Sequence, residues 1–287
     1  MTYAEINATP VLLNIGEAHH NGDWNFKNVS SPFTRIHYVR KGRARMIRAG
    51  EALELRPGYL YLTPPNLCHS YENDGVFETV YLHIYFNAPG HVGLFEWLDL
   101  PPEVPGGPEV EALLSRLLAL HPDRTLRDYD PRQYDNDPGL AERLSDGSRD
   151  SWAVAMETEG LIRLLLSRFL VGASERIGRL DPRIAGALQY IGARLDTHIT
   201  LDELSQAASL SKDHFIRLFS HEMGITPGRY INRKKIEAAQ LRLMLTPQES
   251  VKSVAFSLGF DNLQYFNRLF SALTGESPGR YRLHRGD

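Results

Sequence analysis

The C-terminal third of the chain contains an internal duplication, and this repeat limits the possible folds more than any other feature. Residues 214–230, HFIRLFSHEMGITPGRY, align with residues 265–281, YFNRLFSALTGESPGRY, at a spacing of 51 residues. Ten of the seventeen aligned positions are identical. A repeat of this kind usually corresponds to one supersecondary unit that occurs twice. The sequence therefore predicts two copies of a small helical unit.

Capping and turn residues indicate where the helices of each copy begin. In the first copy, Thr200 and Glu203 have the spacing of a capping box and predict the start of a short helix. In the second copy, Gly259 is expected to provide the turn, because glycine adopts backbone angles that other residues avoid. Asp261 and Gln264 then predict the start of the second helix of that copy.

A longer helix is expected to connect the two copies. Each copy ends with a hydroxyl residue and a proline, Thr226-Pro227 or Ser277-Pro278, which is typical of a helix N-terminus. The helix from Pro227 to about Leu245 would join the copies rigidly. Two short helices joined by a tight turn form a helix-turn-helix. Two such units on one chain can enter successive major grooves of DNA, about 34 Å apart.

The N-terminal part has a different pattern. From Phe33 to about Phe86, short runs rich in Val, Ile, Tyr and Thr are separated by turn residues, and 79–86 is the clearest strand. This pattern predicts a barrel or a sandwich. Amphipathic helices follow at about 110–118 and 152–173, and they could either cover the barrel or pair with a second subunit. Residues 121–149 are expected to form an exposed loop, and 172–182 a linker.

Composition and charge bound the functional classes. Residues 1–180 carry 18 Lys and Arg against 24 Asp and Glu, whereas residues 181–287 carry 14 against 11. The small basic excess of the second part permits nucleic-acid binding but does not argue for it. A single cysteine, Cys68, excludes an intrachain disulfide and is expected to be buried. No signal peptide or membrane span is visible, so we expect a cytoplasmic protein.

Two motifs near the C-terminus carry a specific resemblance. They are residues 258–270, LGFDNLQYFNRLF, and residues 275–282, GESPGRYR. Through them, residues of about 183–284 resemble the DNA-binding domain of the AraC/XylS family of bacterial transcription regulators. Less specifically, residues 42–69 resemble the cupin-like barrel that in many members binds a small effector and helps the protein to dimerise.

The resemblance implies an α+β chain with three parts. Residues 1–105 would form a cupin-like barrel that binds a small molecule, 106–180 a helical dimerisation or linker region with a long loop, and 181–287 an all-α DNA-binding domain with two helix-turn-helix units. The implied function is sequence-specific transcription regulation, as an activator under effector control, without enzymatic activity or a cofactor. The expected partners are double-stranded DNA, RNA polymerase, a second copy of the chain and a small polar effector such as a sugar. No membrane partner is expected.

In this family the second helix of each unit reads base edges. The positions that correspond here are Asp213, Ile216, Arg217, Asn262, Gln264, Asn267 and Arg268. Arginine pairs with guanine, and asparagine or glutamine with adenine. Asp213 would repel phosphate and Ile216 offers only methyl contact, so the first unit is expected to read less sequence than the second. Arg217 and Arg268 occupy one repeat position, which fits either groove contact or an intrahelical salt bridge. Phosphate contacts, or plain surface charges, are expected at Arg229, Lys234, Lys235, Lys252 and Arg280.

A stripe of aromatic and polar residues suggests an effector pocket in the barrel. Its members are Arg35, His37, Tyr61, Tyr81, His83 and Tyr85. Aromatic walls with a few polar groups suit a small polar ligand. The alternative is that Leu82 and Ile84 fill the barrel and the tyrosines face a helix or solvent. His37 has no second histidine two residues away, so no metal site is expected. A cupin-type metalloenzyme with an appended helical domain remains the alternative function. A third possibility is an adaptor that binds a partner through residues 152–173.

Overall fold

The structure is a computed structural model that describes residues 9–87, 93–131, 150–176, 180–246 and 248–283. The chain forms two compact units. The sheet unit contains Thr9–Asn87 and Leu100–Ala173, and the helical unit contains the described residues of 93–99 and 174–283. This division differs from the expected boundaries, because residues 93–99 group with the C-terminal helices and the helices within 106–173 group with the strands.

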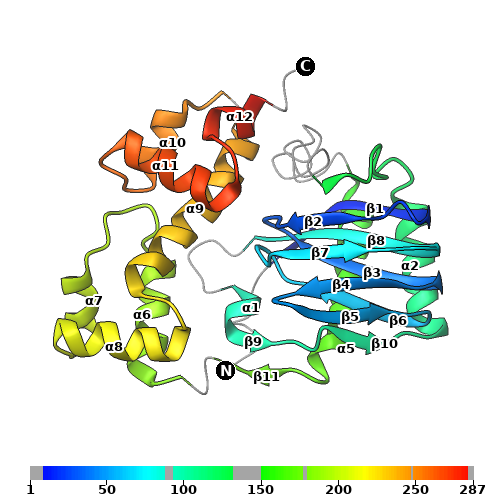
Figure 1. The fold of residues 1–287 in the computed structure, drawn as a ribbon, viewed down its shortest axis with the longest axis horizontal. Coiled ribbons are helices and arrows are strands. Elements are labelled where there is room, and N and C mark those ends of the chain that lie inside the picture. The colour runs from blue at the N-terminus through cyan, green and yellow to red at the C-terminus, as the bar shows by residue number, and fades with distance from the viewer. Residues whose placement is uncertain (1–8, 88–92, 132–149, 177–179, 247, 284–287) are drawn as a thin grey trace. The chain divides into compact units, whose positions relative to one another are not determined.

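The sheet unit contains two antiparallel sheets (Figure 1). The larger has the order β1-β8-β3-β6-β10 and the smaller the order β2-β7-β4-β5. The strands of the larger sheet are β1 (Thr9–Asn21), β3 (Thr34–Gly42), β6 (Tyr59–Thr63), β8 (Val76–Asn87) and β10 (Glu103–Pro105). Those of the smaller sheet are β2 (Phe26–Val29), β4 (Ala44–Arg48), β5 (Glu51–Leu55) and β7 (His69–Glu72). The expected cupin-like fold is thus present as two facing sheets rather than one closed barrel.

Strand register decides which way the aromatic stripe faces. In β3 and β8, Arg35 lies opposite His83 and His37 lies opposite Tyr81, so these four residues share one face of the larger sheet. We call this the inner face, because its neighbouring residues form one core with the smaller sheet, made of Trp24, Val29, Val39, Ala44, Met46, Leu55, Tyr61, Tyr71 and Phe77. Leu82 is on the other face.

Two helices cover the outer face of the larger sheet. The helices α2 (Pro108–Leu120) and α5 (Trp152–Leu170) pack against each other and against β1. Their apolar residues at helical spacing, such as Leu114 in α2 and Ile162 in α5, are fully buried. Of the two roles left open for these helices, the structure therefore shows the covering role.

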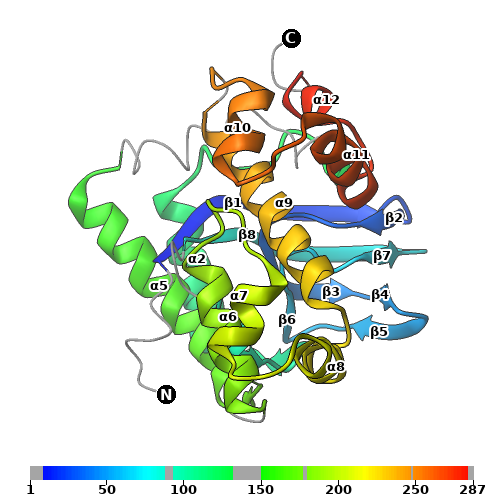
Figure 2. The same ribbon diagram turned by 90° about the vertical axis from the view of Figure 1, so that its left-hand side faces the viewer.

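The helical unit contains the two predicted helix-turn-helix motifs (Figure 2). Its main helices are α6 (Pro182–Gly192), α7 (Leu201–Ala207), α8 (Lys212–Met223), α9 (Pro227–Leu245), α10 (Val251–Ser257), α11 (Leu263–Thr274) and α12 (Pro278–Leu283). The first motif is α7–α8, the second is α10–α11, and α9 connects them as predicted. The repeat is visible in the cores, since Phe215 and Phe219 of α8 are fully buried, as are Phe266 and Phe270 of α11.

Most of the predicted helix starts are confirmed. Thr200 and Glu203 form both hydrogen bonds of a capping box. The predicted start of α11 was wrong by one residue, because the N-cap is Asn262 and not Asp261. The Asn262 side chain accepts a hydrogen bond from the backbone N–H of Tyr265. Among the described residues, no helix has the length and apolar character needed to cross a membrane.

Residues 93–99 form a short strap within the helical unit. They contain α1 (Leu94–Trp97) and β9 (Leu98–Asp99), which pairs with β11 (Ser174–Glu175) in the segment predicted as a linker. Trp97 packs against the core of the first helix-turn-helix. The Glu96 carboxylate accepts hydrogen bonds from the Tyr230 hydroxyl at 2.8 Å and from the Lys234 ammonium at 3.1 Å. A segment that lies between two strands of the larger sheet in sequence is therefore part of the helical unit.

Cys68 is exposed, so the prediction of a buried thiol was wrong. The residue lies in the connection that leads from β6 into β7. The next side chain, His69, is the one that turns inward and is buried. Neighbouring side chains in extended backbone point to opposite sides, which leaves the thiol in solvent.

Candidate functional site

The exposed side chains of α8 form a single stripe. Asp213, Arg217 and His221 follow one another at intervals of four residues and lie opposite the buried Phe215 and Phe219. His214 is exposed beside them. In a helix such a spacing places side chains on one face. The free face of α8 thus presents one acid, one arginine and two imidazoles.

The helix α11 repeats this arrangement. Its exposed residues on the same face are Gln264, Tyr265, Arg268 and Ala272, each 51 positions after an exposed residue of α8. Figure 2 shows α9 running between the two helices, and α9 contacts both of them. Tyr265, His214 and His221 were not predicted as site residues. The signal for all three was the repeat alignment, which places them on the same face as the arginines.

The two arginines at the shared repeat position, Arg217 and Arg268, are exposed. Within the described residues, neither Arg217 nor Arg268 makes a hydrogen bond or ion pair. The intrahelical salt bridge, which was the alternative for this position, is therefore not observed. A guanidinium left unpaired on an exposed helix face can bind a guanine edge or a phosphate.

Three predicted base-reading residues lie beside the stripes rather than on them. Asn262 uses its side-chain oxygen to cap α11, at 2.9 Å from the Tyr265 nitrogen. Ile216 and Asn267 occupy equivalent positions of the two helices and are both half-buried. These three residues are at the flank of the candidate interface, whereas Asp213, Arg217, Gln264 and Arg268 are at its centre.

The predicted phosphate contacts divide into two groups. Arg229, Lys252 and Arg280 are exposed. Lys234 and Lys235 have internal partners instead. The Lys234 ammonium pairs with the carboxylates of Glu96 and Glu237, at 3.1 and 2.8 Å. Lys235 is only 3% exposed. We therefore leave both lysines out of the phosphate contacts, since their charges are engaged inside the unit.

The inner face of the larger sheet brings most of the predicted effector residues together. Arg35, His37, Tyr61, Tyr81 and His83 are all buried there, and Tyr85 is half-buried at the end of the same stripe. The structure adds residues that the sequence reasoning missed: Asn14, His20, Trp24, His69 and Tyr71. Asn14 reaches this face because a β-bulge after Leu12 shifts the register and sets it opposite His83.

Aromatic rings and imidazoles pack closely on this face. The rings of Trp24 and Tyr71 stack with centroids 4.0 Å apart, and the His37 ring meets Trp24 edge-on at 5.3 Å. Burial is the main cause, and the Arg35 charge the second, of a His37 pKa lowered to about 3. Burial and the same charge lower the pKa of His69 to about 4. At neutral pH both imidazoles are therefore uncharged, and each can donate one hydrogen bond and accept another.

Several buried polar atoms on the inner face, or facing it from the smaller sheet, have no hydrogen-bond partner in the described part of the chain. They are both side-chain polar atoms of Asn14, Nδ1 of His37 and Nε2 of His69. Leaving such an atom unsatisfied costs about 1–3 kcal/mol. A bound molecule with hydroxyl, amide or carboxyl groups would recover part of this cost.

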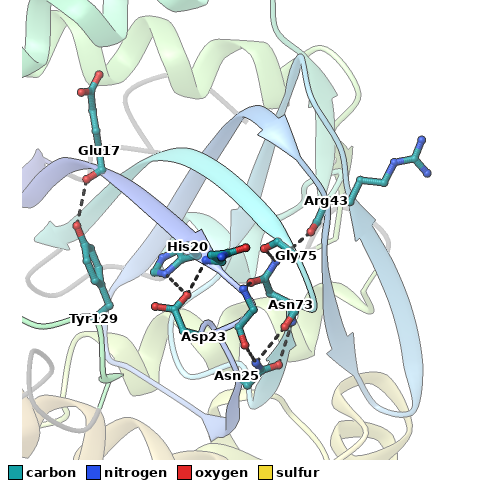
Figure 3. Close-up of polar contacts among 10 residues, drawn as sticks. Glu17, His20, Asp23, Asn25, Arg43, Asn73, Gly75 and Tyr129 are labelled. Carbon is teal, nitrogen blue, oxygen red and sulfur yellow. Dashed lines mark hydrogen bonds and ion pairs between the residues drawn. The ribbon is translucent and has the colours of Figure 1, made fainter.

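The loops that contain Asn25 and Asn73, and the later segment that contains Tyr129, lie at the edge of the inner face (Figure 3). Asn25 and Asn73 exchange two hydrogen bonds of 3.0 Å, each between the side chain of Asn25 and the backbone of Asn73. Tyr129 donates a hydrogen bond to the Glu17 carbonyl, and its ring meets the edge of His20 at 5.0 Å. The first part of the expected loop 121–149 is therefore packed against β1, and residues 132–149 lie outside the described residues. Throughout the described ranges, this region included, no three His, Cys, Asp or Glu side chains are arranged to hold a metal ion.

Comparisons with known protein families match both units. The model of the AraC-like ligand binding domain matches residues 15–147. The model of a helix-turn-helix domain matches residues 204–284. The first range covers the inner face described above except for Asn14, and the second covers α8 and α11.

Individual relatives agree with these matches. The arabinose operon regulatory protein of Salmonella typhimurium is 26% identical over 245 residues, which cover 84% of this chain and 80% of that protein. The probable transcriptional regulator LumQ of Photobacterium leiognathi is 32% identical over 50% of this chain and 56% of its own length. A structure of ToxT from Vibrio cholerae shares the fold, with a TM-score of 0.51 and 14% identity over 98% of this chain and 99% of that chain. The chain belongs to the AraC family of transcription regulators, with a ligand-binding domain in the sheet unit and a helix-turn-helix DNA-binding domain in the helical unit.

Proposed function

We propose that this protein is a cytoplasmic transcription activator that reads DNA with α8 and α11 and recruits RNA polymerase under the control of a small effector. It acts without catalysing a reaction. The observation that carries the proposal is the duplicated exposed stripe, in which Arg217 and Arg268 are unpaired within the described residues. Arginine bidentate to guanine is the commonest specific base contact in the major groove.

The DNA-reading role is tested by selection and substitution. Duplexes are selected from a random library by the wild-type protein, and their affinities are measured at several salt concentrations. Arg217→Ala and Arg268→Ala should each weaken binding to the selected duplex by about 1–3 kcal/mol and relax the preference at one base pair. A chain that selects no sequence, or variants that bind the selected duplex as tightly as the wild type, would contradict the proposal.

We place the effector on the inner face of the sheet unit. Its support is the set of unsatisfied buried atoms of Asn14, His37 and His69, together with the ring of Trp24. These groups suit a small polar molecule such as a sugar, which carries hydroxyls for the polar atoms and an apolar face for the indole.

A thermal-shift screen of the full chain against sugars and other small polar metabolites tests this assignment, because a bound ligand raises the apparent stability. A ligand of this site should stabilise the wild type and lose most of its effect on Asn14→Ala. An equal shift in both proteins would mean that it binds elsewhere.

We further propose that α5 pairs with a second copy of the chain. Trp152 is 93% exposed, Met156 77% and Val171 90%, and together with Leu164 they form an apolar stripe opposite the buried face of the helix. Large apolar side chains exposed along one side of a helix are typical of interaction sites. Sedimentation should show a dimer that Met156→Glu dissociates. A wild-type monomer at high concentration would contradict the pairing.

A further inference from the structure

One buried ammonium connects the segment before the first helix-turn-helix motif to the turn of the second. Lys235 lies on the connecting helix α9, and its Nζ donates to the carbonyl oxygen of Thr197 at 2.6 Å. The same atom lies 3.4 Å from the carbonyl oxygen of Gly259. Thr197 precedes the first motif, between α6 and α7, and Gly259 is in the turn between α10 and α11 of the second. A single side chain therefore contacts the backbone on both sides of the junction.

The chemistry of Lys235 is unusual for a residue that only fills space. An ammonium loses its hydration when it is buried, and this cost has to be offset by fixed polar partners. Here the partners are two backbone carbonyls, and the Phe260 ring lies 5.5 Å from the ammonium. Carbonyls of two different loops bind one small cation only when the loops keep a fixed separation. An apolar side chain of similar length would fill the same volume without this requirement.

The backbones at the junction also touch directly. Gly259 has a φ of +67°, and a Cβ placed on it would lie 2.4 Å from the carbonyl carbon and oxygen of Thr197. Only glycine allows this approach, since any side chain would need Thr197 to move. Next to this backbone contact, on the protein surface, His198 Nδ1 lies 3.5 Å from a carboxylate oxygen of Asp261.

The junction lies next to the start of a reading helix. Gly259 is three residues before Asn262, the N-cap of α11. A second contact connects α9 with α11. The Asn232 side chain of α9 donates a hydrogen bond of 2.8 Å to the Tyr265 hydroxyl of α11. The position of α11 relative to the first motif is thus fixed through α9 at two points, one buried and one exposed.

We propose that Lys235 is a positioning residue that sets the separation of α8 and α11, and through it the number of base pairs between the two DNA sub-sites that the protein accepts. This proposal rests on the proposed use of α8 and α11 as reading helices. Inserting one base pair moves the second sub-site by about a tenth of a helical turn around the duplex. A rigid pair of reading helices cannot follow that rotation, whereas a pair with a loosened junction can.

The test compares DNA spacing variants with protein variants. The selected duplex is prepared in its original form and with one base pair inserted or removed between the sub-sites. The wild type should lose about tenfold or more in affinity on either change, as for the loss of a base contact. Lys235→Met keeps the length of the side chain but not the ammonium, and it should bind the three duplexes within about threefold of one another. Lys235→Arg, which keeps a buried donor, should retain most of the wild-type discrimination.

Controls separate this role from a purely structural one. Lys252→Met removes an exposed lysine of α10 and should weaken binding to all three duplexes equally. If folded Lys235→Met keeps the wild-type spacing preference and only binds or melts less well, the lysine is structural and the proposal is wrong. If Lys235→Met does not fold, Asn232→Ala replaces it. An unchanged spacing preference in Asn232→Ala would also overturn the proposal.

Failure of this proposal can be distinguished from failure of the proposed function. If Arg217→Ala and Arg268→Ala weaken binding but the spacing preference does not depend on Lys235, only the positioning role is lost. If neither arginine matters, or if the selected sequence has a single sub-site, the proposed reading by two helices is wrong, and the role of Lys235 falls with it.

Discussion

Lowering the pH from 7.5 to 5 should destabilise the sheet unit through two buried histidines. The pKa of His37 is about 3 and that of His69 about 4 in the folded protein, because burial and the nearby Arg35 charge disfavour protonation. In the unfolded chain both are expected near 6.5. Below pH 6.5 the unfolded state therefore binds more protons than the folded state, and stability falls as the pH falls, until it approaches the folded pKa values. At pH 5 the loss is about 2 kcal/mol for each histidine, or about 4 kcal/mol together.

The assay is urea denaturation followed by the fluorescence of Trp24, in a Trp97→Phe/Trp152→Phe background that leaves one tryptophan in the sheet unit. His20 and His121 are also buried with lowered pKa values, so the wild type loses more than these two histidines account for. The decisive quantity is the difference between proteins. A His37→Gln/His69→Gln variant should lose about 4 kcal/mol less than its parent between pH 7.5 and 5. Equal losses in the two proteins would refute the argument that these imidazoles are held uncharged.

Three further predictions concern the helical unit. Gly259→Ala should destabilise it by well over 1 kcal/mol in thermal unfolding, since the added Cβ meets Thr197. Gly224 has a φ of +70°, but no atom lies within 4 Å of a Cβ added there, so Gly224→Ala should cost only about 1 kcal/mol. Thr200→Ala should cost about 1 kcal/mol of stability because it removes a capping box. Ser211→Ala should cost less, because the Ser211 hydroxyl makes no capping hydrogen bond, and equal costs would contradict the assigned caps. Arg229→Ala and Lys252→Ala should each reduce the salt dependence of DNA affinity by about one counterion without changing sequence preference, and an unchanged slope would remove that residue from the phosphate contacts.

The helical unit could be predicted from the sequence to a large extent because its information is local. The repeat, the capping box at Thr200 and the proline at position 227 each act within a few residues of the helix ends that they define. The exception shows the limit of this reasoning. Asp261 and Asn262 are both residue types that favour the N-cap position, so the local sequence does not decide between them, and the helix begins with Asn262.

The roles of individual polar residues were harder to predict because they depend on distant contacts. Lys235 lies on a helix rich in charge, and nothing in the local pattern indicates that the Thr197 carbonyl faces it. The inner face could be predicted in part, since Arg35, His37 and Tyr81 follow from strand alternation. Asn14 and Trp24 could not, because a bulge places the first and a loop the second.

The strap of residues 93–99 has a practical consequence for anyone who divides this protein. From residue 9 onwards, the polypeptide passes from one unit to the other near residues 87, 99 and 173. A cut near residue 180 would produce a C-terminal fragment without the indole of Trp97 and the carboxylate of Glu96. An N-terminal fragment would keep that segment without the surface that shelters it. Exchange of the C-terminal region between homologues should therefore succeed only when residues 93–99 are transferred with it.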